Sequence, residues 1–299
     1  MSGEASFIAS LRALATHPAA RQLADDCAVF DFGNETLVLT HDMMVEGIHW
    51  LPGQDPADIA WKLVAVNLSD LASKGAEPLG VLLGYSLGSD DLRFVEGLRE
   101  ALSAFEVPLL GGDTVGGAAV QAHGMTALGR ATHRPVPSRS GAKAGDTVWL
   151  TGTVGGAMLG FDAVRSDLDD PANRQAFCRP VPPLAEGRAL APHVTAMMDV
   201  SDGLLLDASR LGEASGVTLS LVGDAIPLAE GVARAGRADE ALRWGDDYQL
   251  LFTLPPGTLP AIPATQIGEV RAPGPTPLLL DGTPPDPAQP LGYLHGSSR

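Results

Sequence analysis

The segment from Asp55 to Lys74 is the most regular stretch of the chain, and it constrains the fold more than any other. Asp55 suits an N-cap, Pro56 suits the first turn and Gly75 suits the exit, so the segment predicts a helix of about five turns. An apolar, strand-like run over residues 79–87 follows directly.

Strand-like and helix-like segments alternate along the rest of the chain, a pattern that predicts an α/β (α+β) fold. We expect strands over residues 36–40, 79–87, 107–110, 147–150, 217–222, 248–254 and 266–270. We expect helices over 55–74, 90–105, 156–164, 184–191 and 202–214. The stretch Arg134-Pro-Val-Pro-Ser138 is the best linker candidate. It predicts two domains, residues 1–136 and 137–299.

The charge balance limits the partners of the protein. The 299 residues include 20 Lys and Arg against 36 Asp and Glu, a formal net charge of −16, so a nucleic-acid or anionic-membrane surface is not expected. Cys27 and Cys178 lie far apart, which argues against a disulfide framework and favours a reducing compartment. Neither a membrane span nor a signal peptide is evident. We therefore expect a cytoplasmic protein.

One carboxylate, Asp70, falls within the apolar face of the helix predicted over residues 55–74. At about 100° per residue, Ile59, Leu63 and Val66 lie within about 60° of one another, and Asp70 projects between them. A carboxylate there loses hydration unless a cation or several hydrogen-bond donors meet it. Its partner is either a neighbouring Lys or Arg or a metal ion, and the helix alone leaves both open.

Other aspartates lie next to expected strands, where open α/β folds bind ligands. They are Asp26, Asp42, Asp113, Asp199, Asp202, Asp246 and Asp247. A single aspartate there is usually a turn or cap residue, whereas a close cluster repels itself and needs divalent cations. We expect a cluster of Asp26, Asp42, Asp70 and Asp113, for which the sequence offers no obvious Lys or Arg. All-oxygen ligands favour Mg²⁺ or Mn²⁺, an arrangement typical of phosphoryl transfer.

Several common signatures are missing, among them the P-loop, the protein-kinase motifs and GxSxG. The turn Gly152–Gly156 follows a strand and opens a helix, so it could cradle phosphate, although such turns more commonly serve as tight connections. His41 with Glu46 and His49 offers a rival metal site. His41 and Asp42 are neighbours on an expected strand, however, and would point to opposite faces.

Seven motifs occur in order between residues 20 and 254. They are Asp25-Asp26-Cys-Ala, Thr40-His-Asp42-Met-Met-Val-Glu-Gly-Ile-His49-Trp, Asp55-Pro-Ala-Asp-Ile-Ala with Ala65-Val-Asn-Leu-Ser-Asp70, Gly111-Gly-Asp113-Thr, Arg139-Ser-Gly-Ala-Lys-Ala-Gly-Asp146, Asp199-Val-Ser-Asp-Gly-Leu204 and Gly245-Asp-Asp-Tyr248. Together they resemble the thiamine-monophosphate kinases, of the superfamily that includes aminoimidazole ribonucleotide synthetase and selenophosphate synthetase. The tail beyond residue 255 matches poorly.

The resemblance implies transfer of the γ-phosphoryl group of ATP to thiamine monophosphate, by direct in-line attack with several Mg²⁺ ions. It also implies the two-domain architecture of aminoimidazole ribonucleotide synthetase. The N-terminal domain would bind Mg²⁺ and ATP and form a homodimer through its sheet. The C-terminal domain would close the active-site cleft.

The site residues follow from the resemblance at matching positions. The implied metal ligands are Asp26, Thr40, His41 (through its backbone carbonyl), Asp42, Asp70, Asp113, Asp199 and Asp202, with catalytic roles for Asp42, Asp113 and Asp202. The implied nucleotide contacts are Gly112, Asp113, Arg139 and Ser201. The implied substrate contacts are His49, Asp246 and Tyr293.

Three positions depart from the family pattern. Ala24 replaces the usual Gly, His41 stands where a hydroxyl residue is frequent, and Asp246 replaces Glu. Other functions therefore stay open. They are another ATP-dependent enzyme of the superfamily, for example one that closes a ring on an amidine, a divalent-metal phosphohydrolase, and a non-catalytic nucleotide-binding protein.

Overall fold

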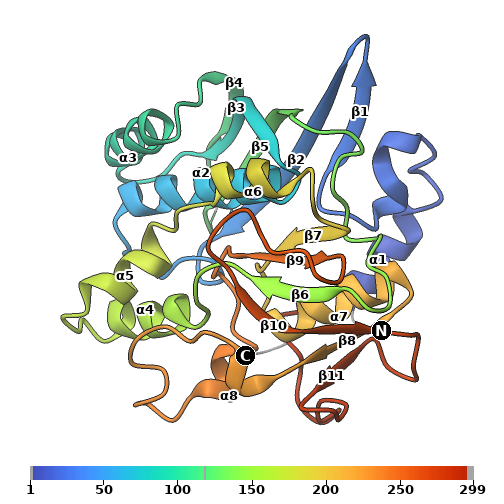
Figure 1. Ribbon diagram of the computed structural model, residues 1–299. Coiled ribbons are helices and arrows are strands. Elements are labelled where there is room, and N and C mark those ends of the chain that lie inside the picture. The colour runs from blue at the N-terminus through green and yellow to red at the C-terminus, as the bar shows by residue number, and fades with distance from the viewer. Residues whose placement is uncertain (1–2, 118, 295–299) are drawn as a thin grey trace.

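The computed structural model describes residues 3–117 and 119–294, which form two sheets with helices packed on them (Figure 1). The first sheet has the strand order β1-β2-β5-β3-β4 and the second β11-β8-β10-β6-β9-β7. The strands of the first sheet are β1 (Ala28–Phe32), β2 (Glu35–Val45), β3 (Ala76–Ser86), β4 (Leu109–Val115) and β5 (Ala122–Ala131). Those of the second are β6 (Thr147–Leu150), β7 (Ala196–Asp199), β8 (Thr218–Leu221), β9 (Leu250–Leu254), β10 (Thr265–Arg271) and β11 (Leu278–Leu280).

The helices connect these strands and cover the faces of the sheets. They are α1 (Gly3–Leu11), α2 (Pro56–Ser73), α3 (Asp91–Ala104), α4 (Gly156–Arg165), α5 (Pro171–Cys178), α6 (Leu184–Leu190), α7 (Leu204–Ser215) and α8 (Ala238–Ala241), with short 3₁₀ helices at Pro18–Leu23 and Gly223–Ala225. Within the described ranges, no helix has both the length and the apolar character needed to cross a membrane.

Helix α2 lies between the two sheets (Figure 1) and contacts β2, β5, β7 and α6. It begins where expected, because the Asp55 carboxylate accepts a hydrogen bond of 2.9 Å from the Ala57 amide. Leu63 and Leu71 belong to the core of the first sheet, whereas Ala72 packs with residues of the second sheet and α6. Polar residues of α2 are buried as well, so the helix has no solvent-facing stripe over most of its length.

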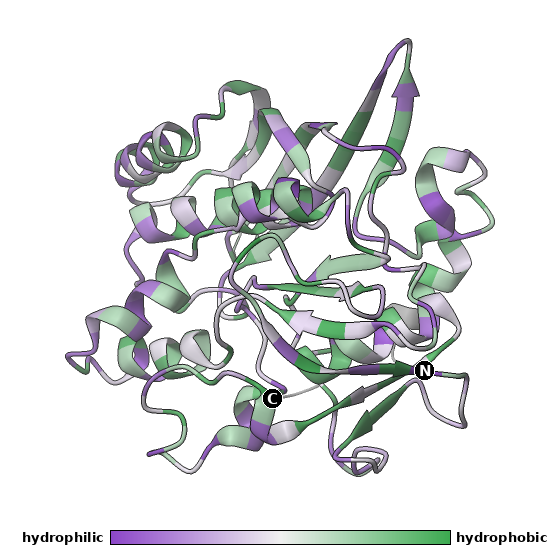
Figure 2. Ribbon diagram, in the orientation of Figure 1, coloured by the Kyte–Doolittle hydropathy of each residue, from purple (hydrophilic) through white to green (hydrophobic). Residues whose placement is uncertain are grey.

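Strand β2 shows how the first sheet separates an inner from an outer face. Val38, Thr40 and Met44 are buried on the side of α2, whereas His41 and Met43 are exposed on the other side, which we call the outer face. The residues of the edge strand β4 are exposed throughout. Hydrophobic residues dominate strands of both sheets, and hydrophilic residues are frequent on α3 (Figure 2).

The expected α/β class is confirmed, and most expected elements occur within a few residues of their predicted bounds. Two differences affect the site. Strand β4 continues to Val115, so Asp113 lies within the strand and not at its end. Strand β5 was not expected, because its sequence AHGMTALGRA has a single β-branched residue and two glycines. The division of the chain at residue 136 stays a prediction.

The close approach of α6 to α2 is testable at Gly187. A Cβ atom there would lie 2.0 Å from the Ala72 carbonyl oxygen, so we expect Gly187→Ala to lower the free energy of unfolding by about 1–3 kcal/mol. Gly116→Ala is the control, because its Cβ would meet only Leu87 Cδ1 at 3.7 Å. Urea denaturation followed by circular dichroism measures both. Equal stability of the two variants would contradict the tight contact.

Candidate active site

A pocket of about 300 Å³ lies where the two sheets meet at α2. Its lining comes from β2, from α2, and from the C-terminal segments around residues 139, 201–202 and 244–248. One part is rich in carboxylates, and another is apolar and aromatic. The residues predicted to bind metal, nucleotide and substrate that line it are Asp26, Asp42, His49, Asp70, Arg139, Ser201, Asp202, Asp246 and Tyr293.

Three carboxylates form the centre of the acidic part. Asp26, Asp70 and Asp199 each offer an oxygen atom, and these atoms lie within 4.8 Å of one another. The Thr40 hydroxyl donates to Asp70, and Ser69 Oγ donates to Asp199 Oδ2 at 2.6 Å. Within the described residues, Asp199 Oδ1 is buried and has no hydrogen-bond partner. An unsatisfied buried carboxylate oxygen among other carboxylates is suited to a cation.

The electrostatics of the pocket indicate an excess of negative charge. Burial, together with Asp26 and Asp202, raises the pKa of Asp42 to about 6. Burial and the Asp26 carboxylate raise the pKa of Asp199 to about 8. Asp70 has its pKa raised well above the ordinary value by burial and by Asp42 and Asp199. These carboxylates are therefore hard to ionise together without a divalent cation.

Asp26 has cationic partners that were not predicted from the sequence. Lys74 Nζ lies 2.7 Å from Asp26 and 2.6 Å from Asp25, and Arg139 pairs with Asp26. Burial acts to raise the pKa of Asp26, but Arg139 and Lys74 outweigh it and hold that pKa below its usual range. The expectation that no Lys or Arg neutralises the cluster is therefore wrong for Asp26. Lys74 caps the end of α2, and Arg139 follows the linker.

Asp202 also has a partner within the chain. Arg210 Nη1 lies 2.5 Å from Asp202 and 3.0 Å from the buried Asp207. Asp207 in turn accepts hydrogen bonds from the amides of Ser201 and Asp202 at 3.1 and 3.0 Å. This network holds the segment around Ser201 against α7, with Asp202 at the edge of the pocket.

The glycine-rich turn over residues 152–156 contacts a carboxylate of the same chain. The Gly155 amide, at the start of α4, lies 3.0 Å from both carboxylate oxygens of Asp247. A helix N-terminus favours an anion, and here the anion is a carboxylate of the same chain. The turn was interpreted either as a phosphate cradle or as a tight connection between a strand and a helix, and the structure supports the second interpretation.

The substrate residues implied by the resemblance line the apolar part of the pocket. His49 Nδ1 accepts a hydrogen bond of 3.0 Å from the Val45 amide. Asp246 accepts from Lys62 at 2.9 Å and from the Tyr248 hydroxyl at 2.9 Å. Tyr293 lines the pocket, as does Trp244. Trp244 was not among the residues predicted from the sequence, although its position directly before the Gly245-Asp-Asp motif was a usable signal.

Two of the residues predicted to bind metal, His41 and Asp113, have side chains or positions away from the carboxylate cluster of the same chain. The His41 ring lies on the outer face, with Nδ1 2.9 Å from Thr126 Oγ, so only its backbone could face the cluster. Asp113 lies on β4, and strands β3 and β5 separate β4 from β2. Residue 42 aligns across the sheet with Gly112, so three strand spacings place Asp113 about 14 Å from Asp42.

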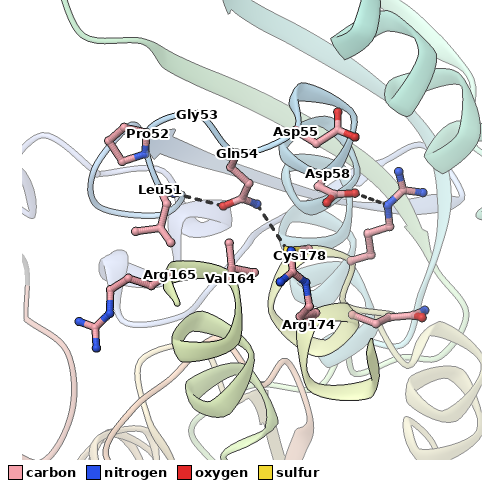
Figure 3. A pocket seen from close by; sticks show the side chains of 12 residues that line it. Leu51, Pro52, Gly53, Gln54, Asp55, Asp58, Val164, Arg165, Arg174 and Cys178 are labelled. Atoms are coloured by element: carbon pink, nitrogen blue, oxygen red, sulfur yellow. Dashed lines mark hydrogen bonds and ion pairs between the residues drawn. The ribbon is translucent and has the colours of Figure 1, made fainter. Parts of the chain in front are cut away.

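A second pocket, of about 490 Å³, lies beside the N-terminal end of α2 (Figure 3). Its carboxylates are paired with arginines: Arg179 Nε lies 2.5 Å from Asp58, and Arg93 Nη2 lies 2.8 Å from Asp55. Gln54 there donates to the Cys178 sulfur at 3.7 Å (Figure 3). Because its acids are already neutralised, this pocket is less suited to metal-assisted phosphate chemistry than the acidic one.

Comparison with known proteins agrees with the seven motifs. Residues 24–131 match the AIR synthase related protein N-terminal domain, and residues 143–274 match the corresponding C-terminal domain. A thiamine-monophosphate kinase of Salmonella typhimurium is 35% identical over 277 residues, which cover 84% of each chain. One from Caulobacter vibrioides is 34% identical over 305 residues, covering 93% of this chain and 86% of that one.

The chain belongs to the thiamine-monophosphate kinase family. A solved structure described as "AaThiL complexed with AMPPCP and TMP" superposes with a TM-score of 0.87 at 27% identity, covering 95% of both chains. Structures of the hydrogenase maturation protein HypE, such as one at 22% identity with a TM-score of 0.65, share the fold. The expected two-domain architecture of this superfamily is thereby confirmed.

The raised pKa of Asp42 predicts how stability depends on pH in metal-free buffer. The folded protein keeps a proton on Asp42 that the unfolded chain releases, so the free energy of unfolding falls as pH rises from about 4 to about 6. Asp42→Asn removes this loss and should stabilise the protein at pH 8 by on the order of 3 kcal/mol. The difference should vanish near pH 3.5.

Thermal denaturation in buffer with a chelator, at several pH values, measures this effect. Asp90→Asn, at an exposed position outside the pocket, serves as the control and should leave the pH profile unchanged. Stability that falls equally between pH 4 and 7 in the wild-type protein and in Asp42→Asn would contradict the proposed repulsion.

Proposed function

We propose that the protein transfers the γ-phosphoryl group of ATP to thiamine monophosphate and forms thiamine diphosphate. The observation that carries the proposal is the cluster of Asp26, Asp70 and Asp199, of which Asp26 and Asp70 line a pocket whose other end is aromatic. Its relatives are named thiamine-monophosphate kinases, and a similar structure is described with an ATP analogue and TMP. The carboxylate cluster would bind the phosphate groups through a metal ion, and the aromatic end of the pocket would bind the ring of thiamine monophosphate.

Mg²⁺ fits the residues that are present. Asp42, Asp70 and Asp199 have raised pKa values, and Asp199 Oδ1 has no partner among the described residues. The donors are all oxygen atoms, which Mg²⁺ prefers over softer sites. Bound there, Mg²⁺ would supply the positive charge that phosphate groups and clustered carboxylates need in order to approach each other.

Arg139 is suited to the nucleotide phosphates. Its guanidinium pairs with Asp26, and its Nε is buried without a hydrogen-bond partner among the described residues. An arginine has donors in a planar fork that matches phosphate oxygens. Arg139 is therefore held in place by one carboxylate while its side chain lines the pocket. Ser201, on the neighbouring segment, lines the same part of the pocket.

Thiamine monophosphate would occupy the part of the pocket lined by Trp244, Tyr293 and Ile48. A thiazolium ring is cationic, and aromatic faces attract cations. The Asp246 carboxylate, whose pKa is lowered mainly by Lys62 against the effect of burial, lies at this end and is paired with the Lys62 ammonium group. The acceptor phosphate is already an anionic nucleophile, so alignment and charge neutralisation suffice for catalysis.

A homodimer through the outer face is part of the proposal. Three apolar residues of the first sheet are exposed: Met43 on β2 by 55%, Leu82 on β3 by 46% and Leu110 on β4 by 56%. Exposed apolar patches often mark interfaces. Met43 also lines the acidic pocket, so a second copy on the outer face would border the pocket. Asp113 on β4 would then serve the site of the second copy.

Turnover provides the direct test. With ATP, Mg²⁺ and thiamine monophosphate, we expect thiamine diphosphate and ADP in equal amounts, because one phosphoryl group moves per ATP. Asp42→Asn and Asp70→Asn should each lower kcat at least 100-fold, by loss of charge where Mg²⁺ binds. The exposed Asp90→Asn is the control. Phosphate release from ATP without an acceptor would favour a phosphohydrolase, and no diphosphate at millimolar substrate would refute the assignment.

Complementation tests whether Asp113 acts in the site of the second copy. We expect Asp42→Asn and Asp113→Asn each to be inactive alone. A purified heterodimer of the two should recover about half of the wild-type rate, because one of its two sites then contains both native carboxylates. Differently tagged chains allow its isolation, and light scattering reports its mass. An inactive heterodimer would show that both carboxylates act within one chain.

A further inference from the structure

Lys62 is one of the largest fully buried side chains among the described residues, with 1% of its side chain exposed. Lysine is rarely buried without a strong reason, because its ammonium group loses hydration. The carboxylate cluster does not provide that reason. Its lysine is Lys74, twelve residues further along α2 and therefore about 18 Å away along the helix axis. Lys62 serves a different part of the pocket.

The ammonium group of Lys62 joins two segments that carry substrate residues. Nζ lies 2.9 Å from Asp246 Oδ2 and donates to the backbone carbonyl of His49 at 3.1 Å. His49 belongs to the segment between β2 and α2, whereas Asp246 belongs to the segment before β9. One buried side chain of α2 thus bridges the two halves of the molecule at the substrate end of the pocket.

The remaining contacts hold Lys62 and Asp246 in this geometry. Nζ lies 4.1 Å from the centre of the Phe177 ring, which gives it a third favourable neighbour. Asp246 has a φ of +61°, its amide donates to the Ser201 carbonyl at 2.8 Å, and its Oδ1 accepts from Tyr248. Both Asp246 oxygens therefore have partners, and the side chain has little freedom to turn without losing one.

Helix α5, which carries Phe177, is fixed against α2 by separate contacts. Arg179 Nε lies 2.5 Å from Asp58, and Gln54 Nε2 donates to Cys178 (Figure 3). Asp58 lies one turn before Lys62 on α2. The Arg179–Asp58 pair therefore joins the same two halves of the molecule without touching His49 or Asp246, which makes it a matched control.

We propose that Lys62 is a positioning residue that sets the affinity for the acceptor substrate by holding His49 and Asp246 at a fixed separation. The inference rests on the proposed function, in which these two residues meet thiamine monophosphate. It assigns Lys62 no contact with ATP or Mg²⁺. Loss of the ammonium group would leave the Asp246 carboxylate buried without its cation and would release the His49 segment.

The test separates the two substrates. In Lys62→Met, which keeps most of the length of the side chain and removes the ammonium group, we expect KM for thiamine monophosphate to rise about 10-fold or more and KM for ATP to change less than about 2-fold. Lys62→Arg, which keeps the charge, should recover most of the affinity. Arg179→Met should lower stability but leave KM for thiamine monophosphate unchanged. Isothermal titration with thiamine monophosphate checks the affinities independently of turnover.

A double variant tests the pairing itself. If Lys62 acts through Asp246, Lys62→Met with Asp246→Asn should weaken binding of thiamine monophosphate by less than the product of the single effects, because no charge is then left unpaired. Should Lys62→Met fail to fold, Lys62→Gln and Lys62→Arg provide the same comparison.

Three results would overturn the inference: an unchanged KM for thiamine monophosphate, equal changes in both KM values, or the same change in Arg179→Met. Failure of the proposed function has a different signature, because the wild-type protein itself would then not phosphorylate thiamine monophosphate. A wild-type enzyme that is active, with a Lys62 variant of normal affinity, would refute the positioning role alone.

Discussion

The burial of α2 on both sides is the constraint on which the rest of the structure depends. A helix between two sheets has no hydrated face, so each of its charged side chains must find a partner in the protein or a ligand. Lys62 finds Asp246, Lys74 finds Asp25 and Asp26, and Asp70 lies beside Asp199. Because these partners come from both halves of the chain, the charges of one helix bring the whole pocket together.

The distribution of cations within this network separates carboxylates whose charge is neutralised from carboxylates whose charge is not. Asp25 and Asp26 are neutralised by Lys74, with Arg139 also on Asp26, and their pKa values are lowered. Asp42, Asp70 and Asp199 have raised pKa values. The protein thus concentrates uncompensated negative charge in one small volume, at a cost in stability that a divalent cation offsets when it binds. Such charge is typical of functional sites.

Much of the site was predictable because its residues stand in local patterns. The start of α2 followed from Asp55 and Pro56, and the unusual position of Asp70 followed from helical periodicity. The opposite directions of His41 and Asp42 followed from strand alternation. Prediction failed where the deciding contact spans the chain. Lys74 and Arg139 are 48 and 113 positions from Asp26, and Asp247 is 92 positions from the Gly155 amide that it accepts from.

The sequence by itself determined the family, the α/β class and the residue types of the site, because motif order, periodicity and capping are local properties of the chain. Tertiary structure decided which carboxylates are neutralised, where β4 places Asp113, and why Lys62 is buried. These depend on desolvation and on Coulomb interactions, which vary with distance in space and not with separation along the chain. Asp26 and Asp42 look alike in the sequence, and only their neighbours in space pair the first with Lys74 and Arg139 and raise the pKa of the second.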